Sequence, residues 1–241
     1  MAQATDLPRN EEGIATALGV LKQQFGDRFQ TGQAVRDQHA HTTTWIKPQA
    51  PDAVVFPRST REVSDIVKVC ATHKVPVIPF GTGTSLEGHV NAPAGGISVD
   101  LSQMDQILAV HSEDLDCVVQ PGVTREQLNV HLRDRGLFFP IDPGANASLG
   151  GMASTRASGT NAVRYGTMKD NVIALEAVMA DGQIIRTAQR AKKTSAGYNM
   201  TQLLVGSEST LGLITILDPI IKPDCSSFFS RWCTAALEIP I

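Results

Sequence analysis

The sequence predicts an α+β fold in which short strands and a few amphipathic helices are mixed along the chain. Apolar residues recur at helical spacing in three segments, and many other segments are short apolar runs typical of strands. These segments do not alternate regularly, which argues against a doubly wound parallel sheet. With 241 residues and an apolar content of 42%, the chain can bury the core of one large or two small domains and is too apolar to be disordered.

The three predicted helices each have a clear beginning and end. The first follows Asn10, a suitable N-cap, and ends at Gly26. The second begins with the capping-box pattern S-T-R-E at 59–62, and the third begins with T-R-E-Q at 124–127 and ends at Gly136. Their apolar faces are formed by Ile14, Ala17, Leu18, Leu21 and Phe25, by Val63, Ile66, Val67 and Cys70, and by Leu128 and Leu132.

The predicted strands lie between and after these helices. Asp181 and Gly182 give a strong hairpin signal between two of them. We expect a boundary between two subdomains in the Gly-, Ala- and Ser-rich stretch after Pro143. The strands are predicted at residues 54–56, 75–80, 97–101, 107–110, 117–120, 137–140, 175–179, 184–187 and 211–216.

Charge and hydropathy exclude several classes of protein. Lys and Arg total 21 against 24 Asp and Glu, and the formal net charge of −3 argues against nucleic acid or an anionic membrane as the main partner. No apolar run is long enough to span a membrane. Residues 1–12 lack the apolar core of a secretory signal, and Asp6, Glu11 and Glu12 fit a transit peptide poorly.

The cysteines and histidines give no sign of a metal or redox site. Cys70, Cys117, Cys225 and Cys233 lie far apart and form no C-x-x-C pair, so we expect free buried thiols in a reducing compartment. The six histidines show no metal-ligand spacing. We therefore predict no protein-bound metal.

A glycine-rich segment, P-F-G-T-G-T-S at 79–85, directly follows an apolar strand. Its two glycines allow a sharp turn that presents several N–H groups, and its hydroxyl side chains add donors, which suits an anionic diphosphate. It lacks the lysine of a Walker A loop, and no helix is expected at 86–93, so neither a P-loop nor a Rossmann site fits. An ordinary glycine-rich turn is the alternative.

Two further segments have unusual composition. Residues 142–166 interleave five glycines with Ala, Ser and Thr, so their backbone could lie flat against a planar ligand; tight packing between two subdomains is the alternative, and both could hold together. Residues 203–214, L-L-V-G-S-E-S-T-L-G-L-I, are predicted to be a loop between two apolar strands. Alone, this last segment is weakly informative.

Taken in order, the three segments resemble the FAD-binding domain of the p-cresol methylhydroxylase and vanillyl-alcohol oxidase type. The matching words are P-F-G-T-G-T-S, then A-S-L-G-G-M-A at 147–153 with G-T-N-A-V-R-Y-G at 159–166, then G-S-E at 206–208 through G-L-I at 212–214. Within this family the chain is similar to cytochrome-linked D-lactate dehydrogenases, through L-E-G at 86–88, M-D-Q-I at 104–107, Q-P-G-V-T-R at 120–125 and S-A-G-Y-N at 195–199. The resemblance runs from about residue 11 to residue 214.

The resemblance implies a two-subdomain FAD-binding domain. We expect an N-terminal helical segment at 1–47, the FAD-binding domain at 48–216 with its subdomains at about 48–142 and 143–216, and an atypical tail at 217–241. Two features depart from the family: Ser209 stands where glycine is usual, and the tail does not resemble the family's long substrate-binding domain. We therefore expect a truncated chain. That domain supplies the family's substrate-binding histidine and arginine, so no catalytic residue is assigned here.

The resemblance also implies a function. FAD would accept a hydride from D-lactate or a related D-2-hydroxy acid, and the electrons would pass to cytochrome c or another acceptor. The alternatives are an FAD-binding module without catalysis of its own, and a relative such as D-2-hydroxyglutarate dehydrogenase, a glycolate oxidase subunit or the non-redox ether-lipid synthase. The chain would be mitochondrial if eukaryotic and cytoplasmic otherwise. The implied cofactor-binding residues are Pro79, Gly81, Thr82, Gly83, Thr84, Ser85, Ser148, Gly151, Ser154, Gly159 and Ile214.

Some members of the family attach the flavin covalently through a histidine in the diphosphate loop. Thr84 stands at that position, so the resemblance implies non-covalent FAD. His89 is expected to be solvated or structural rather than a flavin link, and His39 and His41 are expected at the surface. Residues 164–165, Arg-Tyr, could be a site or only an ion pair and a packed ring.

Overall fold

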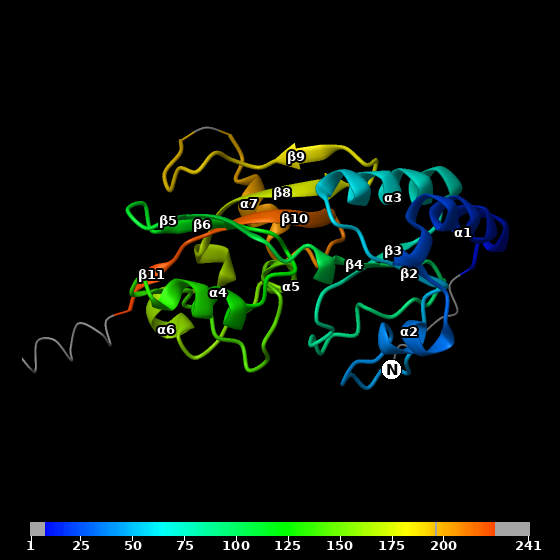
Figure 1. The fold of residues 1–241 in the computed structure, drawn as a ribbon, viewed down its shortest axis with the longest axis horizontal. Coiled ribbons are helices and arrows are strands. Elements are labelled where there is room, and N and C mark those ends of the chain that lie inside the picture. The colour runs from blue at the N-terminus through cyan, green and yellow to red at the C-terminus, as the bar shows by residue number, and fades with distance from the viewer. Residues whose placement is uncertain (1–7, 196, 225–241) are drawn as a thin grey trace, which may run out of the picture.

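The computed structural model describes residues 8–195 and 197–224 (Figure 1). The predictions made for Asp6, Cys225, Cys233 and the tail from 225 onward lie outside these residues. Among the described residues, no helix has the length and apolar character needed to cross a membrane. The elements form two main sheets, and helices and loops connect and cover them.

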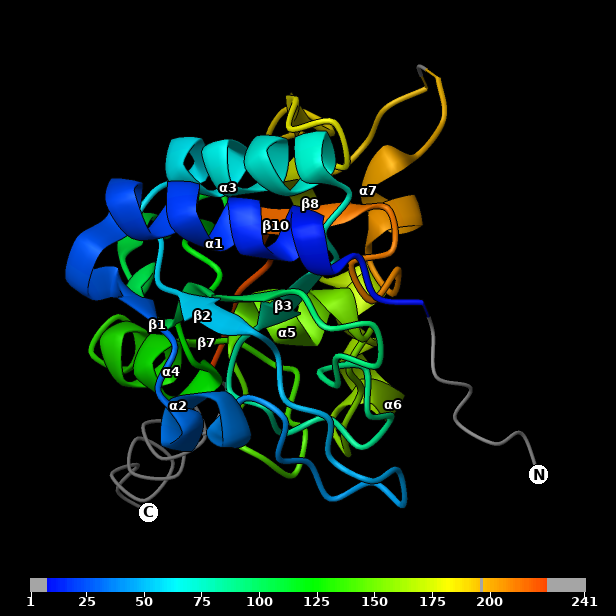
Figure 2. The same cartoon turned by 90° about the vertical axis from the view of Figure 1, so that its right-hand side faces the viewer.

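The first sheet has four strands in the order β1-β2-β4-β3. β2 (Ala53–Val55), β4 (Ile97–Asp100) and β3 (Val77–Phe80) run parallel, and the short β1 (Phe29–Gln30) pairs antiparallel at the edge. β2 and β4 are buried throughout, as expected for central parallel strands. Two helices, α1 (Glu11–Phe25) and α3 (Thr60–His73), lie side by side above this sheet (Figure 2).

The second sheet has five strands, all antiparallel, in the order β5-β6-β10-β8-β9. β10 (Gly212–Pro219) is central, between β6 (Asp116–Val119) and β8 (Val172–Met179). The outer strands are β5 (Ile107–His111) and β9 (Ile184–Arg186).

Short elements complete the fold. α4 (Arg125–Arg133) and α5 (Leu149–Ser154) contribute Leu128, Leu132, Leu149 and Met152 to the core of the second sheet. A small ribbon pairs β7 (Leu137–Phe138) with β11 (Lys222–Pro223). The remaining helices are α2 (Gln33–Gln38), α6 (Ala162–Tyr165) and α7 (Met200–Leu204), with 3₁₀ turns at Gly26–Arg28, Leu101–Gln103 and Met168–Asp170.

The two sheets share a core through α3. The apolar cluster around α1 and α3 includes Val178 of β8 and Leu213 of β10, and α3 contacts both of those strands. Cys70 and Cys117 are free and buried, as the sequence predicts, and burial raises the pKa of each thiol to about 12. Both thiols are therefore uncharged and unreactive at neutral pH.

The three predicted helices are confirmed as α1, α3 and α4. Asn10 caps α1 by accepting a hydrogen bond from the Gly13 N–H at 3.0 Å, and α4 has a complete capping box. The box predicted for α3 is half formed. Ser59 accepts from the Glu62 N–H at 3.3 Å, but the Glu62 carboxylate binds Arg28 and the Arg58 N–H instead of reaching back to Ser59.

Several element predictions need correction. α4 ends at Arg133, three residues before Gly136, and β7 stops at Phe138 because the Phe139 N–H donates to Asn129 Oδ1 at 2.7 Å. Residues 203–214 were predicted to be a loop between two strands, but the helix α7 (Met200–Leu204) includes the first two of them. The sequence also missed β1, β11, α2, α5 and α6, which are all short.

The chain passes from the first sheet to the second at a different position from the predicted subdomain boundary. The change of sheet falls between β4 and β5, before the boundary expected after Pro143, because β5 and β6 pair within the β10 sheet. β10 runs on to Pro219, past the limit predicted at residue 216. At the N-terminal side, β1 joins the first sheet although it belongs to the segment predicted at 1–47.

His39 is buried, so the prediction of a surface position is wrong. It follows α2, an element that the sequence did not reveal, and its Nε2 lies 2.9 Å from Asp100 Oδ2. Its ring packs on Phe80 with centroids 4.3 Å apart. The partner at the end of β4 makes a buried histidine tolerable here. His41 is exposed, as expected.

Candidate functional site

A cavity of about 610 Å³ lies where loops of the first sheet face α5 and the loop before β10. This size is within the range of small-molecule and cofactor sites, roughly 300–1,000 Å³. It is lined by residues 79–87, 89–90, 101, 121, 143–145, 147–148, 150–152, 154–158, 208–209 and 214.

The loop at 81–85 leaves the carboxyl end of β3, where Phe80 is level with Asp100 of the parallel strand β4. Gly83 has φ +66°, a conformation that favours glycine. In the part of the chain that the structure describes, the N–H groups of residues 82–85 make no hydrogen bond, and the hydroxyls of Thr82 and Thr84 lie 3.2 Å apart. The loop therefore offers a group of free donors, which is what a diphosphate requires.

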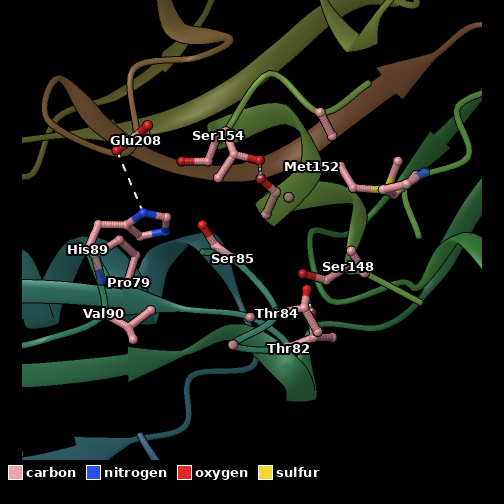
Figure 3. A pocket seen from close by; sticks show the side chains of 18 of the residues that line it. Pro79, Thr82, Thr84, Ser85, His89, Val90, Ser148, Met152, Ser154 and Glu208 are labelled. Atoms are coloured by element: carbon pink, nitrogen blue, oxygen red, sulfur yellow. Dashed lines mark hydrogen bonds and ion pairs between the residues drawn. The ribbon is translucent and has the colours of Figure 1, made fainter. Parts of the chain in front are cut away.

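Ser148 and α5 form the opposite wall. Ser148 precedes α5, but its hydroxyl makes no capping hydrogen bond. That hydroxyl oxygen would lie 2.4 Å from a Cβ built on Gly81 and 3.0 Å from one built on Gly151. Glycine at both positions therefore allows the loop, the serine and α5 to approach closely (Figure 3).

The loop at 206–209 rests on the end of α5. The Gly206 and Glu208 N–H groups donate to the carbonyls of Ala153 and Ser154, each at 2.9 Å, and the hydroxyls of Ser154 and Ser209 are 3.1 Å apart. Ser209 has φ +62°, a conformation that favours glycine, the residue that the resemblance leads one to expect at this position.

Four charged or titratable side chains are among the residues that line the cavity: Glu87, His89, Arg156 and Glu208. His89 Nδ1 lies 3.6 Å from Glu208 Oε2, and the two side chains point toward one another in Figure 3. The hydrogen bond from Ser85 is the largest cause that lowers the pKa of Glu87, and the nearby His89 also contributes.

Ten of the eleven predicted cofactor-binding residues line this one cavity. Gly159 does not; it packs against Asp142, whose Oδ1 would be 2.2 Å from an added Cβ. Asp142 accepts hydrogen bonds from Thr160 and Asn161. Burial opposes ionisation of Asp142, but these hydrogen bonds outweigh it and lower the pKa of the carboxyl. Gly159 therefore shapes a turn near the cavity rather than its lining.

Sequence reasoning did not select the four charged or titratable lining residues, which are Glu87, His89, Arg156 and Glu208. Glu208 stands inside the matched word G-S-E, Arg156 stands between the matched words at 147–153 and 159–166, and both have positive φ, +49° and +51° respectively. The sequence feature that could have identified these two residues is their position in glycine-rich segments. His89 could not be placed because its position depends on the loop's path.

Arg164 and Tyr165 do not line the cavity. The Arg164 guanidinium lies over the Tyr165 ring at 5.2 Å from its centroid, and that ring meets Phe138 edge-on at 5.7 Å. The packed ring is therefore observed, whereas the ion pair is not among the contacts that the described structure gives Arg164.

Comparison with known proteins identifies the class of protein. Residues 51–188 match the family described as FAD binding domain. The chain therefore belongs to this family, and FAD is its cofactor. The cavity fits that group, since it combines sufficient volume, a loop with free N–H groups and several hydroxyl side chains.

Several enzymes are similar to this chain in sequence. The chain is 58% identical over 187 residues to a probable mitochondrial D-lactate dehydrogenase of Danio rerio, with 76% of this chain and 38% of the relative covered. It is 55% identical over 165 residues to a mitochondrial cytochrome-type D-lactate dehydrogenase of Arabidopsis thaliana, with 68% and 29% covered. A glycolate oxidase subunit of Bacillus subtilis is 38% identical over 202 residues, with 82% and 43% covered. The chain thus spans less than half the length of each.

Solved structures show the same fold. An alkyldihydroxyacetonephosphate synthase superposes with a TM-score of 0.79 at 24% identity, covering 90% of this chain and 41% of the other. p-Cresol methylhydroxylase superposes with the same TM-score at 21% identity, covering 90% and 45%. The predicted α+β fold of the p-cresol methylhydroxylase type is confirmed.

Proposed function

We propose that this chain is the FAD-binding part of an oxidoreductase that converts D-lactate, or a related D-2-hydroxy acid, to the 2-oxo acid. The observation that supports this most strongly is that three segments far apart in the sequence, at 79–85, 148–154 and 208–214, all contribute residues to the lining of one cavity. The similarity to proteins named as D-lactate dehydrogenases supports the choice of substrate.

In this proposal the loop at 81–85 binds the diphosphate through its free N–H groups and the hydroxyls of Thr82, Thr84 and Ser85. Ser148, Gly151 and Ser154 contact the remainder of the cofactor from the α5 side, and Pro79 and Ile214 pack on it. The attachment is non-covalent, because Thr84 has no nucleophile suited to a flavin link.

FAD, when bound, supplies the acceptor for the hydride that leaves the substrate Cα. This chain's residues hold and orient the cofactor and cover part of it from water. The hydroxyl proton must pass to a base, which we do not place among the lining residues. The electrons go on to cytochrome c or another acceptor, and the compartment is the mitochondrion if the source is eukaryotic, as in the relatives named above.

A second candidate is a subunit of a glycolate oxidase, favoured by the 38% identity to the Bacillus subtilis protein of that name. A third is an FAD-binding module without catalysis of its own, favoured because no base for the substrate can be placed among the described residues that line the cavity. The three proposals share the same cofactor site and differ in which substrate, if any, reaches the cofactor.

The test is anaerobic reduction of the FAD-loaded chain by D-lactate, L-lactate, glycolate and D-2-hydroxyglutarate over long incubations. Flavin absorbance should fall with D-lactate and not with L-lactate. Selective bleaching by glycolate would favour the second candidate. FAD binding without reduction by any acid would favour the third, and absence of FAD binding would contradict the site itself.

A further inference from the structure

The cavity lining is poor in positive charge for a site that holds a diphosphate. Among its residues in the described structure there are two carboxylates, Glu87 and Glu208, one guanidinium, Arg156, and no lysine. A dianionic diphosphate brought into this cavity adds negative charge beside both carboxylates. An additional cation in this lining would therefore strengthen cofactor binding beyond what the loop's N–H groups provide.

His89 is the lining residue that can supply it. Its side chain is 24% exposed, and its Nδ1 is buried without a hydrogen bond. Glu208 Oε2, at 3.6 Å from that nitrogen, is beyond hydrogen-bond distance but close enough for a strong charge interaction. An Nδ1–H places a donor opposite the Glu208 carboxylate in the imidazolium and in one neutral tautomer, but only the imidazolium also carries an Nε2–H that can donate to a ligand.

The charged groups that face the ring come from both sides of the cavity. Glu87 lies two residues before His89 and is held by Ser85 Oγ at 2.8 Å and by the Leu86 N–H at 3.1 Å. Glu208 comes from the loop that rests on α5. Figure 3 shows His89 pointing at Glu208, with Ser85 of the diphosphate loop nearby.

Resting on the FAD site proposed above, we propose that His89 is a cofactor-binding cation that becomes protonated when FAD binds. Nδ1–H then forms an ion pair with the Glu208 carboxylate, and Nε2–H is left to donate to an oxygen of the cofactor. The diphosphate and the two carboxylates together favour the imidazolium. Arg156 cannot gain a proton when FAD binds, because an arginine is already protonated throughout the physiological pH range.

This assignment makes FAD affinity depend on pH. A site that gains a proton on binding holds its ligand more tightly as the pH falls, and imidazole titrates between about pH 5 and 8. We expect the dissociation constant of FAD to rise about tenfold from pH 5.5 to pH 8.5, the change produced by a difference of about 1.4 kcal/mol.

The experiment is calorimetric titration of the full chain with FAD across this pH range, in phosphate and in Tris, whose heats of ionisation differ. The difference between buffers counts the protons taken up. The wild type should take up a fraction of a proton near pH 7, and His89→Gln should take up almost none and lose the pH dependence. His131→Gln, on the exposed side of α4, is the matched histidine control and should behave as the wild type.

Two further variants separate His89 from its neighbours. Arg156→Gln should weaken FAD binding by a similar factor at every pH, with proton uptake unchanged. Glu208→Gln keeps the histidine but removes the charge opposite Nδ1, and it should reduce proton uptake. If circular dichroism shows that His89→Gln does not fold, the proton uptake of Glu208→Gln still tests the proposal.

The outcomes distinguish this inference from the function on which it rests. If the wild type and His89→Gln bind FAD with the same pH dependence, or if neither shows any, His89 does not have this role and the FAD site stands. If the folded wild type binds no FAD at any pH, the site and the inference both fail.

Discussion

At the scale of single residues, glycine has two different roles in the cavity. Gly81 and Gly151 are needed because the Ser148 hydroxyl occupies the space of a Cβ, whereas Gly83 is needed for its φ of +66°. A Cβ on Gly83 would also come within 2.8 Å of the Phe80 ring. A side chain at Gly83 therefore distorts the loop that presents the free N–H groups.

We predict that Gly83→Val lowers FAD affinity at least about 100-fold while most secondary structure remains. Valine at positive φ costs roughly 1–2 kcal/mol, and the contact with Phe80 forces the loop to move. Gly136→Val is a matched control, since Gly136 has the same φ of +66° but nothing lies within 4 Å of its Cβ. FAD titration by fluorescence should show a loss only for Gly83→Val; a full flavin complement in that variant would contradict the loop assignment.

The residue at position 84 decides how the cofactor is attached. Because threonine stands there, we predict that acid precipitation of the FAD-loaded chain releases all the flavin into the supernatant. The measurement is the absorbance of both fractions after washing the pellet in denaturant. Yellow colour that stays with the pellet would show a covalent link, and peptide mapping would then identify the residue.

At the scale of elements, an ion pair links the turn that follows α1 to the first turn of α3. Arg28 follows α1, and its guanidinium binds the Glu62 carboxylate in the first turn of α3 through two contacts, at 2.6 and 2.8 Å. The hydrogen bond from Arg28 is the largest cause that lowers the pKa of Glu62. Both side chains are less than one third exposed, at 24% and 29%.

We predict that Glu62→Gln lowers the free energy of unfolding by about 1 kcal/mol at pH 7. Because the folded pKa of Glu62 lies below the unfolded value, its contribution is complete above about pH 5 and is lost as the pH falls through the folded pKa. Urea unfolding at pH 7 and near pH 4 should therefore show a smaller difference at the lower pH. The control Glu113→Gln, at an exposed position, should change stability little. An equal loss at both pH values would mean that the carboxylate's charge is not responsible.

Helices and strands were predicted correctly where the local sequence signals are strong. They were missed where strand pairing or burial in the core determines the secondary structure. Asn10, Thr124 and the spacing of apolar residues define α1 and α4 without help from the rest of the chain. α5 lies in a glycine-rich stretch with low helix propensity, and it exists because Leu149 and Met152 are buried in the core of the second sheet. β1 has two residues and is a strand only through its pairing with β2.

At the scale of the whole molecule, the order of strands could not be predicted from the sequence. β10 lies between β6 and β8, about 90 and 30 residues away along the chain, and local patterns contain no information on such pairing. The candidate site was nevertheless largely predictable, because its glycine-rich words are local. His89 and Glu208 were missed since their approach depends on how the two halves fold together.

The last prediction concerns catalysis by the chain as a whole. We expect FAD-loaded chain to be reduced by D-lactate far more slowly than a full-length relative, by at least about 10²–10⁴-fold. Hydride transfer needs the substrate Cα held over the cofactor and a base for the hydroxyl proton, and a positioned base alone contributes about that factor. Among the charged lining residues of the described structure, His89 and Arg156 are assigned above to the cofactor, and no base for the substrate is placed in the lining. The measurement is stopped-flow bleaching of the flavin under anaerobic conditions, with the Danio rerio protein run in parallel and L-lactate as the stereochemical control. Bleaching by D-lactate at a comparable rate would show that this chain contains its own base and carboxylate-binding group, and His89 and Arg156 would then be the first residues to reassign.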